Sequence, residues 1–215
     1  MKRRDMLSRA VGCLALPAVS LPAWAQAKVP QAGVDFLRLD AQVAVEASAG
    51  QVEVLEFFWY NCPHCNAFEP RLTAWLARLP QHVSFRRVPV AFRADFEPQQ
   101  RLYYALEAMG LVERLHGKIF AAIHGERQNL NTAPAIIDWV ERQGVDRQKF
   151  TEQFNSFSAT TKANRAKRLQ NQYRVAGVPS MGVAGRFYTD GEQARTMERM
   201  LQVVDFLVAE VHAGR

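Results

Sequence analysis

Short apolar stretches alternate along the chain with longer stretches of helical periodicity. Residues 34–39 alternate enough to predict a short strand, and residues 52–59 are almost continuously apolar, as expected of a buried central strand. Apolar residues then recur every three or four positions from Phe68 to Leu79, which predicts a helix that ends at Pro80. Residues 83–90 predict a third strand, so this half of the chain predicts a parallel β-α-β unit.

The middle of the chain is predicted to be helical. Apolar stripes and capping residues predict helices over residues 98–109, 112–124 and 133–143, a short helix after Asp146, and a longer one over about 158–174. Strand-like residues return at 181–184 and 186–189, and an amphipathic helix follows over 197–211. The order β-α-β, helices, β-β-α predicts an α/β fold with an inserted all-helical domain.

The first 25 residues are typical of a cleaved secretory signal peptide. A basic stretch is followed by an apolar one over 11–23, and Ala23-Trp24-Ala25 matches the small-x-small pattern of a cleavage site. The apolar stretch is too short, and too broken by prolines, to span a bilayer stably. We therefore expect the mature chain to be exported. Arg3-Arg4 leaves the twin-arginine and general secretory routes both open.

Removal of residues 1–25 changes the charge balance. The full chain has 27 basic and 21 acidic residues and a net charge of +6; without the leader, 23 basic and 20 acidic residues remain, a net charge of +3. So small an excess gives no argument for nucleic-acid binding. The remaining length suits one compact domain or a domain with an insertion.

Cys62-Pro63-His64-Cys65 lies where the apolar strand gives way to a helix. Apart from Cys13 in the predicted leader, these are the only cysteines, and their spacing predicts a redox-active pair. A structural disulfide around so short a loop would remove little unfolded-state entropy. At a helix N-terminus, unpaired N–H groups and the macrodipole favour a thiolate. We therefore expect Cys62 to be the more exposed nucleophile and Cys65 the covered resolving thiol.

The element order and the motif together resemble the DsbA family of bacterial periplasmic thiol oxidases, which have the thioredoxin fold. Pro63 costs nothing in the first turn of a helix, and the resemblance implies that Pro63 and His64 tune the pair towards an oxidising couple. The expected divisions are a signal peptide (1–25), the first half of the thioredoxin fold (26–94), the inserted helical domain (95–160) and the second half of the fold (161–215).

Glu56 interrupts the apolar strand, and an unpaired buried carboxylate is costly. Arg87 on the adjacent predicted strand is a candidate partner. The resemblance implies an acidic residue at position 56 that assists proton movement to the buried cysteine, and a basic residue, usually Lys, near position 87. A guanidinium does not release its proton, so Arg87 could only fix or charge Glu56. A simple buried ion pair remains the alternative.

Val178-Pro179 opens the returning strand. An ordinary trans bond is the usual state before proline. The resemblance implies a cis bond here, facing the cysteine pair, where the backbone of Val178 can pair with an extended substrate. Trp59 and Tyr60 are expected in the core, with a place on the substrate surface left open. We interpret His82, His116, His124 and His212 as surface or helix-end residues without metal-ligand spacing.

The leading hypothesis is a periplasmic thiol oxidase that donates its Cys62–Cys65 disulfide to unfolded exported proteins through a mixed disulfide at Cys62. The resemblance implies reoxidation by a DsbB-like membrane quinone reductase. We expect a monomer that needs no cofactor, neither metal, flavin nor nucleotide. One alternative is a disulfide isomerase or reductase with the same motif. Another is a non-catalytic module, either a metal carrier that uses the two thiols or a chaperone.

Overall fold

The computed structural model describes residues 28–215, so the predicted signal peptide lies outside the described residues. Within them, a single mixed sheet has the strand order β1-β5-β4-β2-β3. Its strands are β1 (Leu37–Arg38), β2 (Val52–Phe58), β3 (Val83–Pro89), β4 (Ser180–Val183) and β5 (Phe187–Asp190). The β2–β3 pair is parallel and the other neighbouring pairs are antiparallel.

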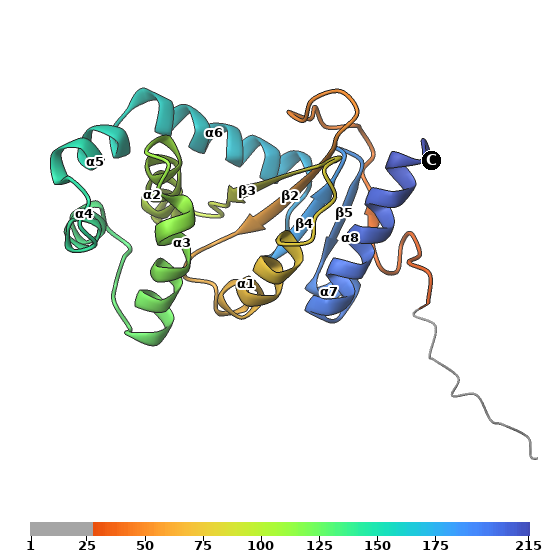
Figure 1. Cartoon of the computed structure of the whole chain (residues 1–215), viewed down its shortest axis with the longest axis horizontal. Helices are drawn as coiled ribbons and strands as arrows, with labels where there is room; N and C mark the ends of the chain where they lie inside the picture. The colour runs from red at the N-terminus through yellow and green to blue at the C-terminus, as the bar shows by residue number, and fades with distance from the viewer. Residues whose placement is uncertain (1–27) are drawn as a thin grey trace, which may run out of the picture.

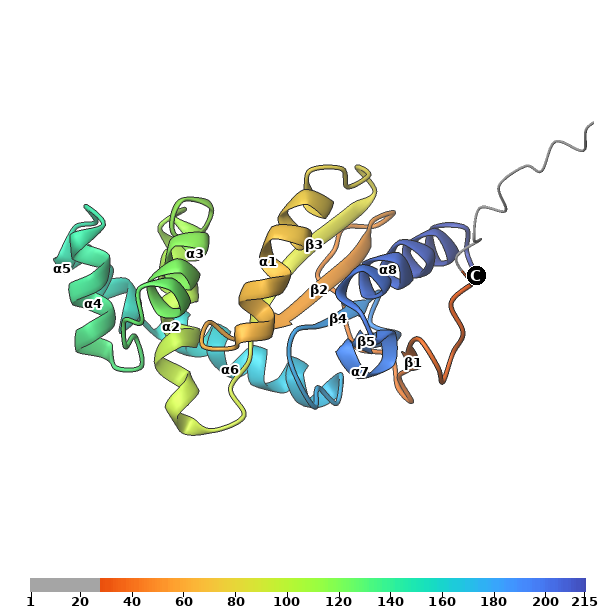
Figure 2. The same cartoon turned by 90° about the horizontal axis from the view of Figure 1, so that it is seen from below.

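Helices cover both faces of the sheet and form a block at one end of it (Figure 1). Those on the sheet are α1 (Pro63–Leu76), α6 (Phe157–Gln172), α7 (Gly191–Ala194) and α8 (Met197–His212). The block, called the helical insertion below, holds α2 (Glu97–Ala108), α3 (Val112–Phe120), α4 (Ala133–Arg142) and α5 (Arg147–Phe154), with a 3-10 turn (Ala94–Phe96) and a π-helical turn (Ala121–Gly125). Figure 2 shows α1 and α8 on one face of the sheet and α6 on the other. None of the helices in residues 28–215 is long and apolar enough to cross a membrane.

The side chains of β2 alternate between two hydrophobic clusters. Val54 lies in a cluster with Phe68 of α1 and with α8, whereas Leu55 and Phe57 lie in the cluster that contains Tyr173 at the end of α6. All residues of β2 are buried, so both faces of the strand are covered. This explains why its sequence is almost continuously apolar.

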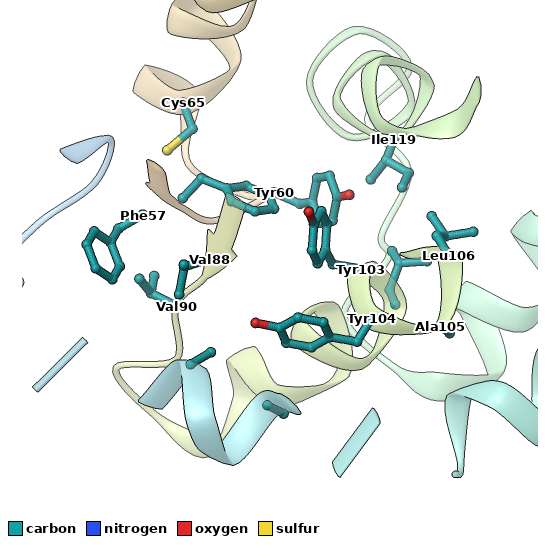
Figure 3. Close-up of a cluster of buried hydrophobic side chains, with 14 of the residues drawn as sticks. Phe57, Tyr60, Cys65, Val88, Val90, Tyr103, Tyr104, Ala105, Leu106 and Ile119 are labelled. Atoms are coloured by element: carbon teal, nitrogen blue, oxygen red, sulfur yellow. The ribbon is translucent and has the colours of Figure 1, made fainter. Parts of the chain in front are cut away.

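The helical insertion packs against the end of β2 and the loop that follows it. Tyr60 in this loop is 1% exposed, and its ring lies 5.1 Å from that of Phe58 and 5.2 Å from that of Phe120 in α3. Figure 3 shows Tyr60 between Cys65 of α1 and Tyr103 of α2. The insertion is therefore joined, through buried aromatic side chains, to the immediate surroundings of the cysteine pair.

The predicted fold class and element order are confirmed, with local differences. In the stretch predicted as a strand at 34–39, the backbone pairs with β5 only at Leu37–Arg38. The helix predicted over 112–124 is α-helical to Phe120 and then widens into the π-helical turn. Helix α7 was missed, because four residues are too few to show periodicity and the carboxylate of Asp190 holds them by capping two backbone N–H groups.

Candidate active site

The cysteine motif occupies the N-terminus of α1, directly after the buried strand β2. Cys62 is the N-cap residue, and its carbonyl accepts the first helical hydrogen bond from the backbone N–H of Asn66 at 3.1 Å. Pro63 is the first helical residue, a position where its missing N–H leaves no partner unsatisfied. No side chain caps the helix end, so its free N–H groups are directed at the position of the Cys62 sulfur.

The two sulfurs differ in exposure as predicted. Cys62 is 8% exposed and Cys65 is 1% exposed, and both are free thiols, so the structure describes the reduced state. The Val178–Pro179 bond is cis, as predicted. The carbonyl oxygen of Val178 lies 3.3 Å from the Cys62 sulfur, so in this state it faces the predicted nucleophile. His64, which lies between the cysteines, is exposed.

The environment separates the pKa values of the two thiols. A hydrogen bond from the Cys65 thiol lowers the pKa of Cys62 to about 6. Partial burial opposes this shift, and hydrogen bonds from the backbone N–H groups of Cys65 and His64 add to it. The charge of His64 acts in the same direction. Burial raises the pKa of the Cys65 thiol well above its usual value. At neutral pH the pair therefore holds one thiolate at Cys62 and one thiol at Cys65.

We expect the ultraviolet absorbance of the Cys62 thiolate to titrate with a midpoint near pH 6, well below the roughly 8.5 of a free cysteine. Because the folded-state pKa of Cys62 is depressed, the contribution of this thiol to the stability of the reduced protein should be fully present above about pH 8.5 and should be lost as the pH drops through 6. A Cys62→Ser variant is the control and should lack both transitions. A midpoint at the free-cysteine value would contradict this account.

The predicted pairing of Glu56 with Arg87 is present. The two residues are register partners in the parallel β2–β3 pair, and Arg87 Nε lies 3.0 Å from Glu56 Oε2. The side chains are 1% and 9% exposed, so this is a buried ion pair. Burial nevertheless raises the pKa of Glu56 to about 8. The charge of Arg87 offsets this desolvation only in part, and the negative charge of Glu69 raises the pKa of Glu56 further.

Glu69 was not predicted as a site residue. It lies on α1 four residues after Cys65, and its Oε1 accepts a hydrogen bond from Arg87 Nη2 at 2.7 Å. Burial alone would raise the pKa of Glu69, but contacts with His116 and Arg87 together lower it. The available signal was the i, i+4 spacing from Cys65, which places both side chains on one side of the helix.

The interpretation of His116 as a surface or helix-end residue is wrong. It is 4% exposed, its Nδ1 lies 2.9 Å from the Tyr60 hydroxyl, and its Nε2 lies 3.4 Å from Glu69 Oε2. His124 is half-buried and its Nε2 lies 2.8 Å from the Tyr60 carbonyl oxygen. Tyr60 is thus a core residue. Trp59 is half-buried and stacks on the ring of Phe96 at 3.8 Å.

A cavity of about 450 Å³ opens beside the cysteine motif. It is bordered by His64, by Val178 and Pro179 before β4, and by the segment that leads from β5 through α7 into α8. Met197 and Met200 give it an apolar part, and Glu192 and Arg195 give it charged groups. Within residues 28–215 no group of three or more His, Cys, Asp or Glu side chains is arranged to hold a metal ion.

Comparison with known proteins agrees with this geometry. The family described as the DSBA-like thioredoxin domain matches residues 53–202. The thiol:disulfide interchange protein DsbA of Burkholderia cepacia is 42% identical over 189 residues, which span 88% of this chain and 89% of that protein. The Pseudomonas aeruginosa protein of the same name is 37% identical over 190 residues, which span 88% of this chain and 90% of that protein.

Solved structures of DsbA proteins are also similar to this chain. The crystal structure of Pseudomonas aeruginosa DsbA aligns with a TM-score of 0.82 and 36% identity over 86% of this chain and 96% of that one. The oxidoreductase DsbA from Xylella fastidiosa aligns with a TM-score of 0.80 and 30% identity over 86% of this chain and 99% of that one. The chain therefore belongs to the DsbA family and is a thiol:disulfide oxidoreductase with the thioredoxin fold.

Proposed function

We propose that this oxidoreductase works as an oxidase in the periplasm, where it donates the Cys62–Cys65 disulfide to cysteines of newly exported proteins. The observation that carries the proposal is the separation of the two thiols. Since the thiolate of Cys62 is stabilised and the thiol of Cys65 is buried, the reduced pair is favoured over the disulfide. A disulfide with a stabilised reduced form is a strong oxidant, because it gives up its bond readily.

The reaction begins when a substrate thiolate attacks the Cys62 sulfur of the oxidised pair. The Cys62–Cys65 bond breaks, its electron pair goes to the Cys65 sulfur, and that sulfur takes up a proton. A second substrate thiolate then attacks the substrate sulfur of the mixed disulfide, and Cys62 leaves as a thiolate. The substrate has lost two electrons and two protons; one proton is on Cys65 and the other is in solvent. Cys62 leaves easily because its pKa is low.

Glu56 is the group proposed to supply the proton to Cys65. Cys65 is 1% exposed, so bulk water does not reach it directly. Glu56 is buried and holds a proton up to about pH 8; once it is ionised, its charge adds to the burial that raises the pKa of Cys65. A protonated carboxylic acid beneath the buried sulfur can donate in the step that breaks the disulfide, directly or through one water.

The proposed substrate surface is the cavity beside His64, Val178 and Pro179. An unfolded chain can lie there in extended form, with its cysteine at Cys62 and its apolar side chains against Met197. The reduced pair would then be reoxidised at the same surface by a DsbB-like membrane quinone reductase. We propose that the protein acts as a monomer, since one chain supplies both sulfurs and the cavity.

The proposal is tested by equilibrating the protein with glutathione and by mixing the oxidised protein with a reduced, unfolded polypeptide. An oxidase should be mostly reduced in a glutathione buffer set to the poise of the endoplasmic reticulum, and should transfer its disulfide stoichiometrically. A pair that stays oxidised at that poise, and that instead reduces or rearranges disulfides, would support a reductase or isomerase and contradict the proposal.

A further inference from the structure

Two buried carboxylates share one guanidinium beneath the cysteine pair. Arg87 Nε lies 3.0 Å from Glu56 Oε2, and Arg87 Nη2 donates to Glu69 Oε1 at 2.7 Å. The side chains of Glu56 and Arg87 are less than one tenth exposed, and that of Glu69 is 15% exposed. A single positive charge cannot compensate two buried negative charges, so the two carboxyl groups tend to share one proton. What matters for catalysis is which carboxyl group carries it.

His116 of the helical insertion contacts only one of the two carboxyl groups, that of Glu69. The Tyr60 hydroxyl lies 2.9 Å from Nδ1, and when it donates to that nitrogen the neutral imidazole carries its own proton on Nε2, the tautomer that the proposal below requires. That nitrogen lies 3.4 Å from Glu69 Oε2, and among the described residues neither of these two buried atoms makes a hydrogen bond. The N–H group of His116 is therefore directed at the Glu69 carboxylate in a long polar contact that is not a hydrogen bond in this structure. No second donor of this kind approaches Glu56 within the described part of the chain.

The other charged and titratable groups around His116 do not change this assignment. The groups that face it come from the loop before α1, α1, β3, α2 and its own helix: Tyr60, Glu69, Arg87, Tyr103 and Glu113. Burial lowers the pKa of His116, so the ring is neutral at pH 7 and offers Glu69 the dipole of an N–H group rather than a full charge.

We propose that His116 is a positioning residue that places the shared proton on Glu56, the carboxyl group beneath Cys65, by holding Glu69 as the ionised partner of Arg87. The catalytic purpose rests on the proposed function, because only the proton on Glu56 is of use to Cys65. The directions of the two pKa shifts agree with the geometry: the pKa of Glu56 is raised and that of Glu69 is lowered.

The same contacts give the site a route to solvent. A cavity of about 480 Å³ between α1 and α3 is bordered by Glu69, Arg87 and His116. When Glu56 gives its proton to Cys65, the pair of carboxylates carries one uncompensated negative charge, and a proton from this cavity restores the neutral state. Glu69 and Glu113 both border this cavity, but only Glu69 shares Arg87 with Glu56. The His116 contact favours transfer of the proton from Glu69 onward to Glu56.

The test is to locate the proton by carbon-13 NMR of protein with labelled glutamate carboxyl groups, titrated between about pH 4 and 10. In the wild type, the Glu56 signal should titrate near pH 8 and the Glu69 signal below the usual range of a glutamate. In His116→Phe, which removes the donor, the high titration should move from Glu56 to Glu69. His116→Gln, which keeps an N–H donor for Glu69, should restore the wild-type assignment.

His124→Phe is the matched control, because His124 also belongs to the insertion and contacts Tyr60 but faces neither carboxylate. It should leave both titrations unchanged. If Glu56 keeps the high titration in His116→Phe, or does not have it in the wild type, the proposal is overturned.

Glu69→Gln keeps the test decisive if His116→Phe does not fold. Without the competing carboxylate, Arg87 should ionise Glu56 well below pH 8, and an unchanged Glu56 titration would also overturn the proposal. None of these measurements needs a substrate. The proton can therefore be located correctly in a protein that fails as an oxidase, and an active oxidase can carry its proton elsewhere.

Discussion

We expect the Cys65→Ser variant to accumulate a stable mixed disulfide with a cysteine-containing peptide, and the Cys62→Ser variant to form none. Cys62 is the sulfur with the low pKa at the helix end, so we expect it to be the one that exchanges. In Cys65→Ser the serine hydroxyl cannot attack the mixed disulfide, so the complex has no internal route of release. Both variants should lose dithiol oxidation completely.

The measurement is electrophoresis without reductant, followed by mass spectrometry of the captured peptide, after each single-thiol variant is mixed with an oxidised peptide. The two serine variants are matched controls for each other, since each keeps one thiol of the same pair. Capture by Cys62→Ser would mean that Cys65 is accessible to a substrate. That result would contradict its position at 1% exposure.

The second large effect is expected for Glu56→Gln, which should stabilise the oxidised protein at alkaline pH and slow its reduction. Glu56 has a folded-state pKa of about 8, above the roughly 4.3 of an unfolded chain. The folded protein therefore binds more protons than the unfolded one between these values, and its stability falls as the pH rises. The slope can reach about 1.4 kcal/mol of unfolding free energy per pH unit.

The amide in Glu56→Gln does not titrate, so this slope should disappear. Urea unfolding of the oxidised protein at several pH values measures it without interference from the Cys62 thiolate. The two proteins should differ least below about pH 4, where the carboxyl group is neutral in both states. Loss of the proton donor should slow the reduction of the disulfide by on the order of a hundredfold. A wild-type stability that rises between pH 5 and 8 would show that Glu56 is ionised throughout.

The local chemistry of the motif could be predicted from the sequence because it depends on near neighbours. A buried strand followed by Cys62-Pro63 fixes the first sulfur at a helix N-terminus, and three residues later the second sulfur points inward. The pairing of Glu56 with Arg87 followed from the parallel arrangement of two adjacent strands, in which register partners lie side by side. The cis bond before Pro179 needed the family resemblance, because most bonds to proline are trans.

Only the tertiary structure decided which groups complete the site. Glu69 and His116 lie 47 positions apart in the sequence and meet because the fold places α3 opposite α1, across the cavity that both helices border. Figure 1 shows α3 in the block of helices at the end of the sheet. His116 borders the apolar stripe of its own helix, so its sequence position fits a buried and an exposed side chain equally well. The packing of the helical insertion on Tyr60 buries the His116 side chain. Burial and long-range contact set the protonation of this site, and neither is encoded in the spacing of residues along the chain.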